Sequence, residues 1–290
     1  MTLKDYLNKA ATDGWATGHF NASELDQMRA IVEASAELVS PAIVGMSEGE
    51  RNHIGLREAV VLREIFEKEY NIPVFLNADH SKSVVAAEKA IDAGFNSIHI
   101  DLSSKSFDEN AAGTKEIVRF AKSRNPEISV EGELGYLKGE SKVHKIKIEV
   151  DPEDYTKPEE AVKFVAATGV DRLAIVVGNI HGISPAEPRL DIERIKNIFS
   201  ALKSANLDVN LVLHAGSGIP DDQISAAIAA GISNIHINTD IRIAYVEAFK
   251  KSFAENADEV AMYKIDVTAM EAMKNVVKAK LELFHSVSIL

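Results

Sequence analysis

Short runs of β-branched and other apolar residues alternate with amphipathic segments along the chain. The short runs predict strands at residues 16–20, 42–46, 74–76, 97–100, 129–133, 173–177, 211–214 and 234–237. Between them, apolar residues recur at helical spacing and predict helices at residues 24–38, 56–70, 84–93, 113–123, 158–168, 192–204 and 221–230. Several of these helical segments end at glycine, the residue that often follows a helix.

Eight strands with intervening helices in about 240 residues are what a (β/α)8, or TIM, barrel needs. We therefore predict an α/β fold: a single TIM-barrel domain over residues 1–290, with a C-terminal helical extension and a long loop at about 135–156. A doubly wound sheet is the alternative. Such a sheet seldom has eight evenly spaced units, and no G-x-G-x-x-G sequence follows the first predicted strand.

Two segments stand outside this alternation. The stretch 135–156 contains Gly135, Gly139 and several lysines, and it is long for a strand-to-helix loop. It is predicted either as a mobile lid over a site or as a solvated insertion. Helical patterns also run through 239–255 and 267–284, and the last of these either closes the barrel or meets a second subunit.

Composition narrows the class of protein. The chain has 290 residues, 46% of them hydrophobic, and no cysteine, so disulfides and thiolate metal sites are excluded. A net charge of −12 argues against nucleic-acid binding. The N-terminus lacks the pattern of a signal peptide, and no apolar run approaches the roughly 18 residues of a membrane span. We expect a cytoplasmic protein that binds neither membrane nor nucleic acid, and that would need a local site to bind an anionic substrate.

Three histidines stand just past apolar runs and just before small residues: His80, His181 and His214. Neutral imidazole is the commonest metal ligand, and three of them leave one position of a tetrahedral Zn²⁺ open for chemistry. Because the carboxyl ends of barrel strands meet at one rim, we expect these three to converge on one ion. The other histidines are interpreted as ordinary core or surface residues; they are His19, His53, His99, His144 and His285.

Carboxylates accompany the histidines. Asp79 adjoins His80. It is a candidate general acid–base group beside a metal, or else it orients a histidine by accepting a hydrogen bond from its N–H. Asp101 and Glu133 either hold a second or alternative metal position or act as acceptors behind the ligands. Polar residues stand at the carboxyl end of every predicted strand, as a barrel active site requires, and they include Asn21, Ser47, His236, Asn238 and Thr239.

The sequence Gly216-Ser217-Gly218 precedes a predicted helix. Glycines bring backbone N–H groups close to an anion, and a helix N-terminus adds its dipole. Loops after the seventh and eighth strands are the usual phosphate site of a barrel, and Gly182 offers another N–H. Schiff-base chemistry would instead need a lysine at a strand end, and the predicted strand ends offer none.

At these residues the chain closely resembles the class II (zinc-dependent) fructose-bisphosphate aldolases, including tagatose-bisphosphate aldolases. The resemblance covers nearly the whole chain and rests on Gly18-His19-Phe20-Asn21, Ser40-Pro41, Ser47-Glu48-Gly49, Asp79-His80, Ile100-Asp101-Leu102-Ser103, Val130-Glu131-Gly132-Glu133-Leu134-Gly135, Gly178-Asn179-Ile180-His181-Gly182, Leu213-His214-Ala215-Gly216-Ser217-Gly218-Ile219-Pro220 and Asn238-Thr239-Asp240.

The resemblance implies a TIM barrel with Zn²⁺ on His80, His181 and His214, and with room for a second metal or a monovalent cation. It implies that Asp79 exchanges the hydroxyl proton, while the metal polarises the ketone of dihydroxyacetone phosphate and stabilises the enediolate. It also implies a phosphorylated sugar as substrate and a homodimer or homotetramer. The ketose-phosphate cradle matches Gly182, Gly216, Ser217, Gly218 and the segment 236–239, and Ser47 matches a serine near the second phosphate.

Three positions depart from the family pattern. The loop glutamate that takes the C–H proton of the ketose falls at Ser141, so Glu140, one residue earlier, is the candidate base. His236 stands where the family usually has an asparagine that helps to hold the substrate. Ala215 replaces a glycine, a change that we expect to matter less.

These observations favour a class II metal-dependent aldolase that cleaves a ketose bisphosphate, with fructose 1,6-bisphosphate as the first expectation. The products would be dihydroxyacetone phosphate and glyceraldehyde 3-phosphate. A tagatose-bisphosphate or other ketose-phosphate aldolase is the alternative, since the sequence does not fix the stereochemistry at C4. A non-catalytic aldolase-like subunit and a metal-dependent barrel hydrolase are the alternatives from other classes.

Overall fold

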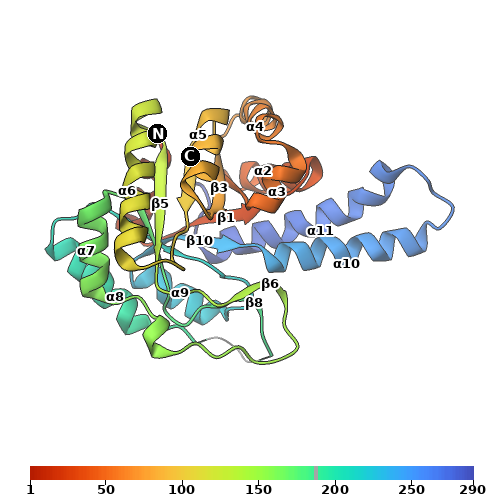
Figure 1. Ribbon diagram of the computed structural model, residues 1–290. Coiled ribbons are helices and arrows are strands. Elements are labelled where there is room, and N and C mark those ends of the chain that lie inside the picture. The colour runs from red at the N-terminus through yellow and green to blue at the C-terminus, as the bar shows by residue number, and fades with distance from the viewer. Residues whose placement is uncertain (186–188) are drawn as a thin grey trace.

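The computed structural model, which describes residues 1–185 and 189–290, is an α/β fold with a closed barrel of eight parallel strands (Figure 1). Around the barrel the strands follow the order β1-β10-β9-β7-β5-β4-β3-β2. The TIM-barrel prediction is therefore confirmed. The barrel strands are β1 (Thr17–Asn21), β2 (Ala42–Met46), β3 (Val74–Ser81), β4 (Ser97–Ile100), β5 (Ser129–Leu134), β7 (Arg172–Ile175), β9 (Asn210–Leu213) and β10 (Ile232–Ile237).

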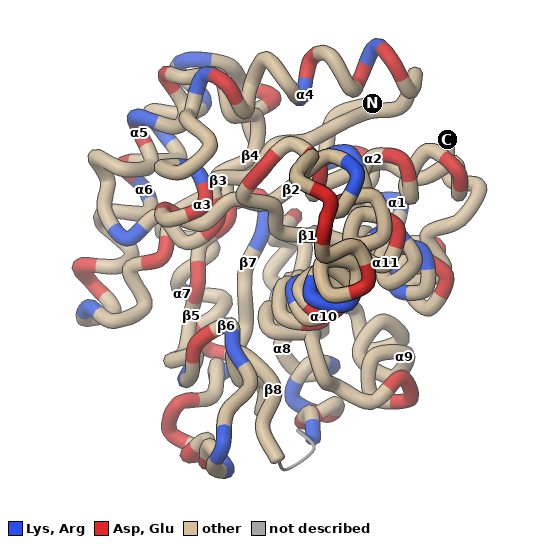
Figure 2. The backbone as a smooth tube through the Cα atoms, turned by 90° about the vertical axis from the view of Figure 1, so that its right-hand side faces the viewer, with Lys and Arg blue, Asp and Glu red and all other residues tan. Residues whose placement is uncertain are grey.

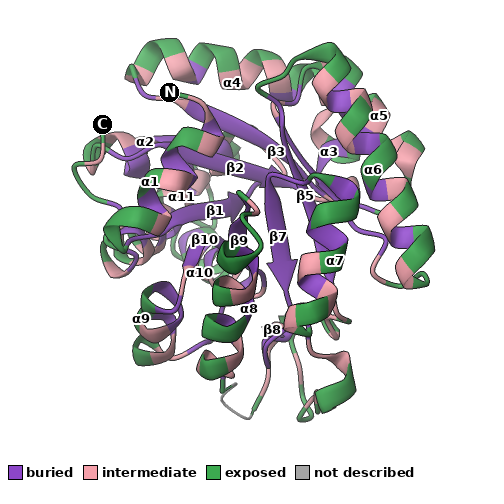
Figure 3. Ribbon diagram, turned by 90° about the vertical axis from the view of Figure 1, so that its left-hand side faces the viewer, coloured by how far each residue is buried: buried purple, intermediate pink, exposed green. Residues whose placement is uncertain are grey.

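Helices surround the barrel, with buried strands inside and the exposed helix faces outside (Figure 3). Acidic and basic residues are interspersed over this outer layer (Figure 2). The helices are α1 (Leu3–Asp13), α2 (Leu25–Glu37), α3 (Glu48–Ile54), α4 (Leu56–Tyr70), α5 (Val84–Ala93), α6 (Phe107–Arg124), α7 (Pro158–Thr168), α8 (Ile192–Ser204), α9 (Asp221–Ala229), α10 (Thr239–Glu255) and α11 (Met262–Leu283), with a 3-10 turn η1 (Pro152–Asp154).

Local sequence explains where these helices begin and end. In α6, the Ser106 side chain accepts a hydrogen bond from the Glu109 N–H, and the Glu109 side chain accepts one from the Ser106 N–H. These two backbone N–H groups at the start of the helix therefore both have partners. Helix α5 ends at Gly94, which adopts a left-handed conformation at φ +111°. The apolar faces of these helices pack on the outside of the strands and form the main core, while Leu3, Tyr6 and Leu7 of α1 form a smaller separate cluster with β2 and β3.

The structure corrects several predicted boundaries. Strand β3 continues to Ser81, so Asp79 and His80 lie inside a strand rather than beyond it. Helices α1 and α3 were not predicted. The segment 135–156 contains strand β6 (Gly139–Val143) and η1, and β6 pairs with β8 (His181–Ile183) in a separate small sheet. His181 therefore lies in this small sheet, six residues beyond the end of the barrel strand β7.

Helices α10 and α11 form a long hairpin that extends away from the barrel (Figure 1). The inner part of α11 is buried through Met273, Val277 and Leu281, and this helix packs on α2. The outer part of the hairpin exposes apolar side chains, among them Phe253, Met262 and Tyr263. None of the helices in the described part of the chain is long and apolar enough to cross a membrane.

Candidate metal centre and active site

A cavity of about 340 Å³ opens at the carboxyl ends of the barrel strands. Most of the residues singled out by the sequence line it: Asn21, Ser47, Asp79, His80, Glu140, His181, Gly182, His214, Ser217, His236, Asn238 and Thr239. Asp101, Glu133, Gly216 and Gly218 lie behind or beside this lining rather than in it. The cavity is also lined by residues that the sequence did not single out for this purpose: Lys82, Gly139, Ser141, Ala215 and Arg242.

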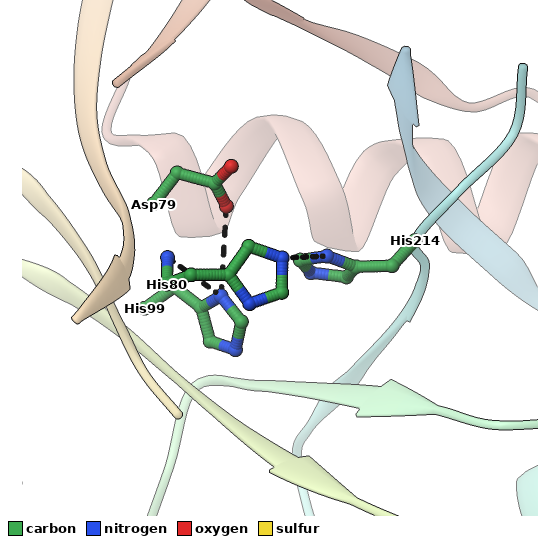
Figure 4. A group of neighbouring side chains, drawn as sticks. All are labelled: Asp79, His80, His99 and His214. Atoms are coloured by element: carbon green, nitrogen blue, oxygen red, sulfur yellow. Dashed lines mark hydrogen bonds and ion pairs between the residues drawn. The ribbon is translucent and has the colours of Figure 1, made fainter. Parts of the chain in front are cut away.

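His80 and His214 form the centre of the site (Figure 4). Nε2 of His80 lies 3.2 Å from Nδ1 of His214. The other nitrogen of each ring faces a carboxylate: His80 Nδ1 lies 2.7 Å from Asp101 Oδ2, and His214 Nε2 lies 2.6 Å from Glu131 Oε1. With those nitrogens donating to carboxylates, the two facing nitrogens are both available to a cation.

This pair fits a metal ion. Two imidazole nitrogens bound to one tetrahedral Zn²⁺ at 2.0–2.1 Å lie about 3.3 Å apart, close to the observed separation. The donor set of imidazoles and carboxylates is also the kind that zinc and related divalent ions prefer. Asp79, His80, His99 and His214 can bring one ligand atom each within 4.8 Å of one another.

His181 reaches the same cavity from β8, with its ring centroid 5.0 Å from that of His80. Its backbone N–H donates to the Lys138 carbonyl, and its own carbonyl lies 2.9 Å from Nε2 of His144. Burial and the neighbouring His80 hold the pKa of His181 well below its usual value, which keeps the ring neutral. The structure thus brings the predicted trio to one cavity, with His80 and His214 in direct contact and His181 beside them.

His99 was interpreted from the sequence as an ordinary core or surface residue, but it belongs to this cluster. The ring is fully buried, and its Nδ1 accepts a hydrogen bond from the backbone N–H of His80. Its Nε2 lies 3.3 Å from Glu133 Oε2. Strand alternation in the sequence could have identified it. Ser97 and His99 are two residues apart in β4, so both side chains point to the same face, the inside of the barrel.

His80 adopts φ +45°, a left-handed conformation that costs a non-glycine residue about 1 kcal/mol. A β-bulge-like shift in the pairing of β3 with β4 falls between Ala78 and Ser81, around this residue. Such strain is characteristic of functional sites, where the surrounding structure holds a side chain in a required direction. Here it aims the His80 ring across the barrel mouth toward His214.

Asp79 is buried beside the histidines. Its Oδ2 accepts a hydrogen bond from Asn21 Nδ2 at 3.1 Å, and Asn21 also donates to Glu50. Its Oδ1 lies 3.5 Å from His99 Nδ1 and 3.6 Å from His236 Nδ1, and among the described residues it has no hydrogen-bond partner. A fixed carboxylate with one free oxygen at the cavity wall can take or give a proton.

Asp101 and Glu133 lie behind the histidines. Asp101 accepts from Nδ1 of His80 and pairs with the Lys82 ammonium. Ser103 Oγ lies 2.7 Å from Asp101 Oδ1 and 3.1 Å from Glu133 Oε1, so it bridges the two carboxylates. Together with His80 and His99 they form a second cluster of potential ligand atoms.

The glycine-rich turn differs in detail from the anion cradle expected from sequence. The N–H of Gly216 donates to the His236 carbonyl within the barrel, at 2.9 Å, so it does not point at a ligand. Ser217 Oγ accepts from the N–H groups of Asn238 and Asp240 at the start of α10. Ala215 adopts φ +57°, a left-handed conformation, so the replacement of glycine here carries a strain that we did not expect.

The segment 139–144, which is β6 followed by His144, lines the cavity through Gly139, Glu140 and Ser141. Gly182 is required beneath it, because a Cβ there would lie 2.2 Å from the Lys142 carbonyl oxygen. The Glu140 carboxylate is largely exposed and pairs with Lys142 at 2.5 Å, and this hydrogen bond lowers its pKa. His144 Nε2 lies 2.9 Å from the His181 carbonyl oxygen and 3.1 Å from that of Glu140, which ties the segment to β8.

Two cations line the cavity that the sequence analysis did not place there. Arg242 of α10 pairs with the buried Glu50. Lys82 follows β3 directly, so the prediction that no lysine stands at a strand end was wrong. The pairing of Lys82 with Asp101 outweighs its partial burial and raises its pKa, which favours the charged ammonium over the free amine that Schiff-base chemistry needs.

Comparison with known proteins places this arrangement among aldolases. The sequence profile of the family described as Fructose-bisphosphate aldolase class-II matches residues 1–288. The chain is similar to the D-tagatose-1,6-bisphosphate aldolase subunit GatY of Klebsiella oxytoca, at 36% identity over 280 residues, which cover 96% of this chain and 95% of that protein.

Two solved structures share the fold. The YdjI aldolase from Escherichia coli K12 has a TM-score of 0.82 and 30% identity, and the match covers 98% of this chain and 97% of that one. Fructose-bisphosphate aldolase (Fba) from Campylobacter jejuni has a TM-score of 0.83 at 21% identity, with 99% and 94% covered, and it bears on the fold alone.

Proposed function

Because this chain belongs to the class II fructose-bisphosphate aldolase family and is thus a carbon–carbon lyase, we propose that it reversibly cleaves a ketose bisphosphate to dihydroxyacetone phosphate and an aldehyde. The observation that carries the proposal is the pair of facing nitrogens of His80 and His214, each ring oriented by a carboxylate, in one cavity with Asp79. The family is metal-dependent, and this cluster of donors supports the same dependence here.

We assign His80, His181 and His214 as the residues that would hold a Zn²⁺ ion. When bound, the ion supplies Lewis-acid polarisation of the substrate ketone. Asp101 and Glu133 orient His80 and His99 through the contacts described above, and we assign them this role ahead of direct coordination. The second cluster that they form with the two histidines is the place for an additional cation.

Asp79 is the proposed acid–base group for the hydroxyl proton. Its Oδ2 is fixed by Asn21, and its buried Oδ1 lies against the rings of His99 and His236, with no hydrogen-bond partner among the described residues. Asn21 is held in turn by Glu50, which also accepts the Ser47 N–H at 2.7 Å. This chain of hydrogen bonds connects the carboxylate to the wall of the cavity where Ser47 lies, and it restricts the carboxylate to one rotamer.

The cavity carries features that suit a substrate with phosphate at both ends. Ser217 in the turn after β9, Thr239 at the start of α10 and Gly182 in β8 all line the cavity, and we propose that they bind the ketose phosphate together with Gly218. Asn238 and His236 would contact the carbon chain. The cations Lys82 and Arg242 also line the cavity and favour a doubly anionic ligand over a neutral sugar.

Fructose 1,6-bisphosphate and tagatose 1,6-bisphosphate are the two substrates to compare. The first was our expectation from the sequence, whereas the relative GatY is named for the second. The two differ only in the stereochemistry at C4, so side-by-side assays of dihydroxyacetone phosphate release are required. The protein should act on one or both with Zn²⁺ present and lose activity after chelation.

Variants make this test specific. His80→Ala should abolish both zinc binding and cleavage, whereas His53→Ala, a change at an exposed histidine of α3, should leave both unchanged. Cleavage that survives chelation and His80→Ala would overturn the metal assignment. Tight zinc binding without dihydroxyacetone phosphate release from any ketose bisphosphate would overturn the substrate assignment and favour a non-catalytic aldolase-like subunit.

We further propose that the protein assembles as a homodimer or homotetramer and acts in the cytoplasm. The exposed apolar side chains on the α10–α11 hairpin support assembly, because they would be covered by a second subunit. Light scattering coupled to size exclusion measures the molar mass directly. A monomer of 31.6 kDa at micromolar concentration would contradict this part of the proposal.

A further inference from the structure

An arginine lies fully buried inside the barrel below the candidate metal centre. Arg172 is the first residue of β7, and its side chain points into the barrel interior, where Nε donates to Ser129 Oγ at 3.1 Å. Its Nη2 donates to Ser97 Oγ at 2.5 Å and to Asn77 Oδ1 at 3.2 Å. These bonds from three neighbouring strands hold the guanidinium in one orientation.

The remaining edge of the guanidinium faces Glu131, with Nη1 2.7 Å from Oε2 in an ion pair whose angles are not those of a hydrogen bond. Both side chains are fully buried. Removing such charges from water costs several kcal/mol per ion, which a close pair with further hydrogen bonds repays only in part. Two apolar side chains would fill the same space, so simple filling of the barrel does not explain why an ion pair lies here.

Glu131 connects this pair to the candidate metal centre. Its Oε1 lies 2.6 Å from His214 Nε2, whereas His99 Nε2 is 4.0 Å from Oε1 and His236 Nε2 is 3.9 Å from Oε2. Only the contact with His214 is within hydrogen-bond range. Since an ionised carboxylate only accepts, the Nε2 atom of His214 must carry the proton.

A proton on Nε2 leaves the lone pair of a neutral His214 ring on Nδ1. Nδ1 is the atom that faces His80 across 3.2 Å, in the space where the cation would bind. Arg172 fixes Glu131, and Glu131 fixes both the tautomer and the direction of the His214 ring. The opposite tautomer would point an N–H at the cation and remove His214 as a ligand.

We propose that Arg172 and Glu131 are a positioning pair that holds His214 as the Nε2–H tautomer, with Nδ1 presented as a metal ligand. This inference rests on the metal site of the proposed function, but it does not depend on the identity of the substrate. Neither residue lines the cavity, so we assign Glu131 an action through His214 and Arg172 an action through Glu131.

The test compares the wild-type protein with Glu131→Gln, with Arg172→Met and with the double variant. A single change leaves an unpaired buried charge and can prevent folding, whereas the double variant leaves none. The glutamine amide offers both a donor and an acceptor to His214, so it no longer selects a tautomer. Lys122→Met is the matched control, because it breaks the Lys122–Asp171 ion pair, of the same 2.7 Å length, away from the cavity.

Two readouts separate positioning from mere support of the fold. Zinc affinity, measured by competition with a chromophoric chelator, should fall about 10- to 100-fold in the double variant and stay within twofold of wild type in Lys122→Met. Nitrogen-15 NMR of the metal-free wild-type protein should show His214 protonated at Nε2, and the folded double variant should show this preference reduced.

Wild-type protein with His214 protonated only at Nδ1 would overturn the proposal, and so would a folded double variant that binds zinc within twofold of wild type. Because both readouts are made without substrate, failure of the aldolase assignment would appear separately, as zinc binding without cleavage of ketose bisphosphates.

Discussion

The imidazole rings of His19 and His236 are stacked, with 3.5 Å between their centroids and 11° between their planes. They come from the paired strands β1 and β10, in which these two residues are in register. Gly45 of β2 makes room for the His19 ring, because a Cβ there would lie 2.0 Å from His19 Cε1. The stack places a second ring against His236, which lines the cavity.

Acid should destabilise the protein through His19. Burial outweighs the nearby Asp79 and Glu131 and lowers its pKa from 6.5 to about 4. The unfolded chain therefore takes up this proton first, and stability falls as the pH drops through this window, by about 2 kcal/mol between pH 7 and pH 5. Urea unfolding of metal-free wild type and His19→Gln checks this. The variant should lose about 2 kcal/mol less over that interval, and an equal loss in both proteins would contradict the assignment.

The stack itself should show as a coupling energy. His236→Asn removes one ring, and His19→Gln removes the other. In a double-mutant cycle the two changes should couple by about 0.5–1.5 kcal/mol, the range for stacked aromatic pairs. Urea unfolding at pH 7.5, where both rings of the pair are neutral, measures this. Strict additivity of the two changes would show that the stack contributes no stability.

Ala215→Gly should stabilise the protein. The residue adopts φ +57°, where alanine is strained by about 1 kcal/mol and glycine is not, so the free energy of unfolding should rise by up to that amount. The matched control is Ala112→Gly at an exposed position inside α6, which should lower stability by about 1 kcal/mol. The same chemical change is thus expected to have opposite signs at the two positions, and loss of stability at both would contradict the strain.

Glu140→Gln tests the candidate carbon-acid base. If Glu140 removes the C–H proton, kcat should fall 10²- to 10⁴-fold with little change in KM, and exchange of the dihydroxyacetone phosphate proton with D₂O should slow equally. Ser141→Ala is the comparison at the position that the family pattern favours. Lys142→Met removes the partner that holds the Glu140 carboxylate at the surface. Wild-type exchange in Glu140→Gln would place the base elsewhere.

The alternation of apolar runs and helical segments was enough to predict the barrel, because a parallel sheet covered by helices leaves this periodicity in the sequence. The rim residues were predictable for the same reason, since strand ends of a barrel must meet. Thus His80, His181 and His214 reach one cavity although more than 130 residues separate the first from the last. The small β6–β8 sheet was missed because each strand is short and β6 is largely exposed, with no apolar alternation to reveal it.

Within the site, the sequence by itself determined which chemical groups are present and which end of the barrel carries them. Only the tertiary structure decided how they are paired. The alternation of side chains along each strand places His99, Glu131 and Arg172 inside the barrel. Their contacts, however, depend on the register of strands β4, β5 and β7 and on closure of the barrel. A one-residue change in register would exchange the inward and outward sets, so hydrogen bonds such as that between Glu131 and His214 are properties of the closed barrel rather than of any one segment.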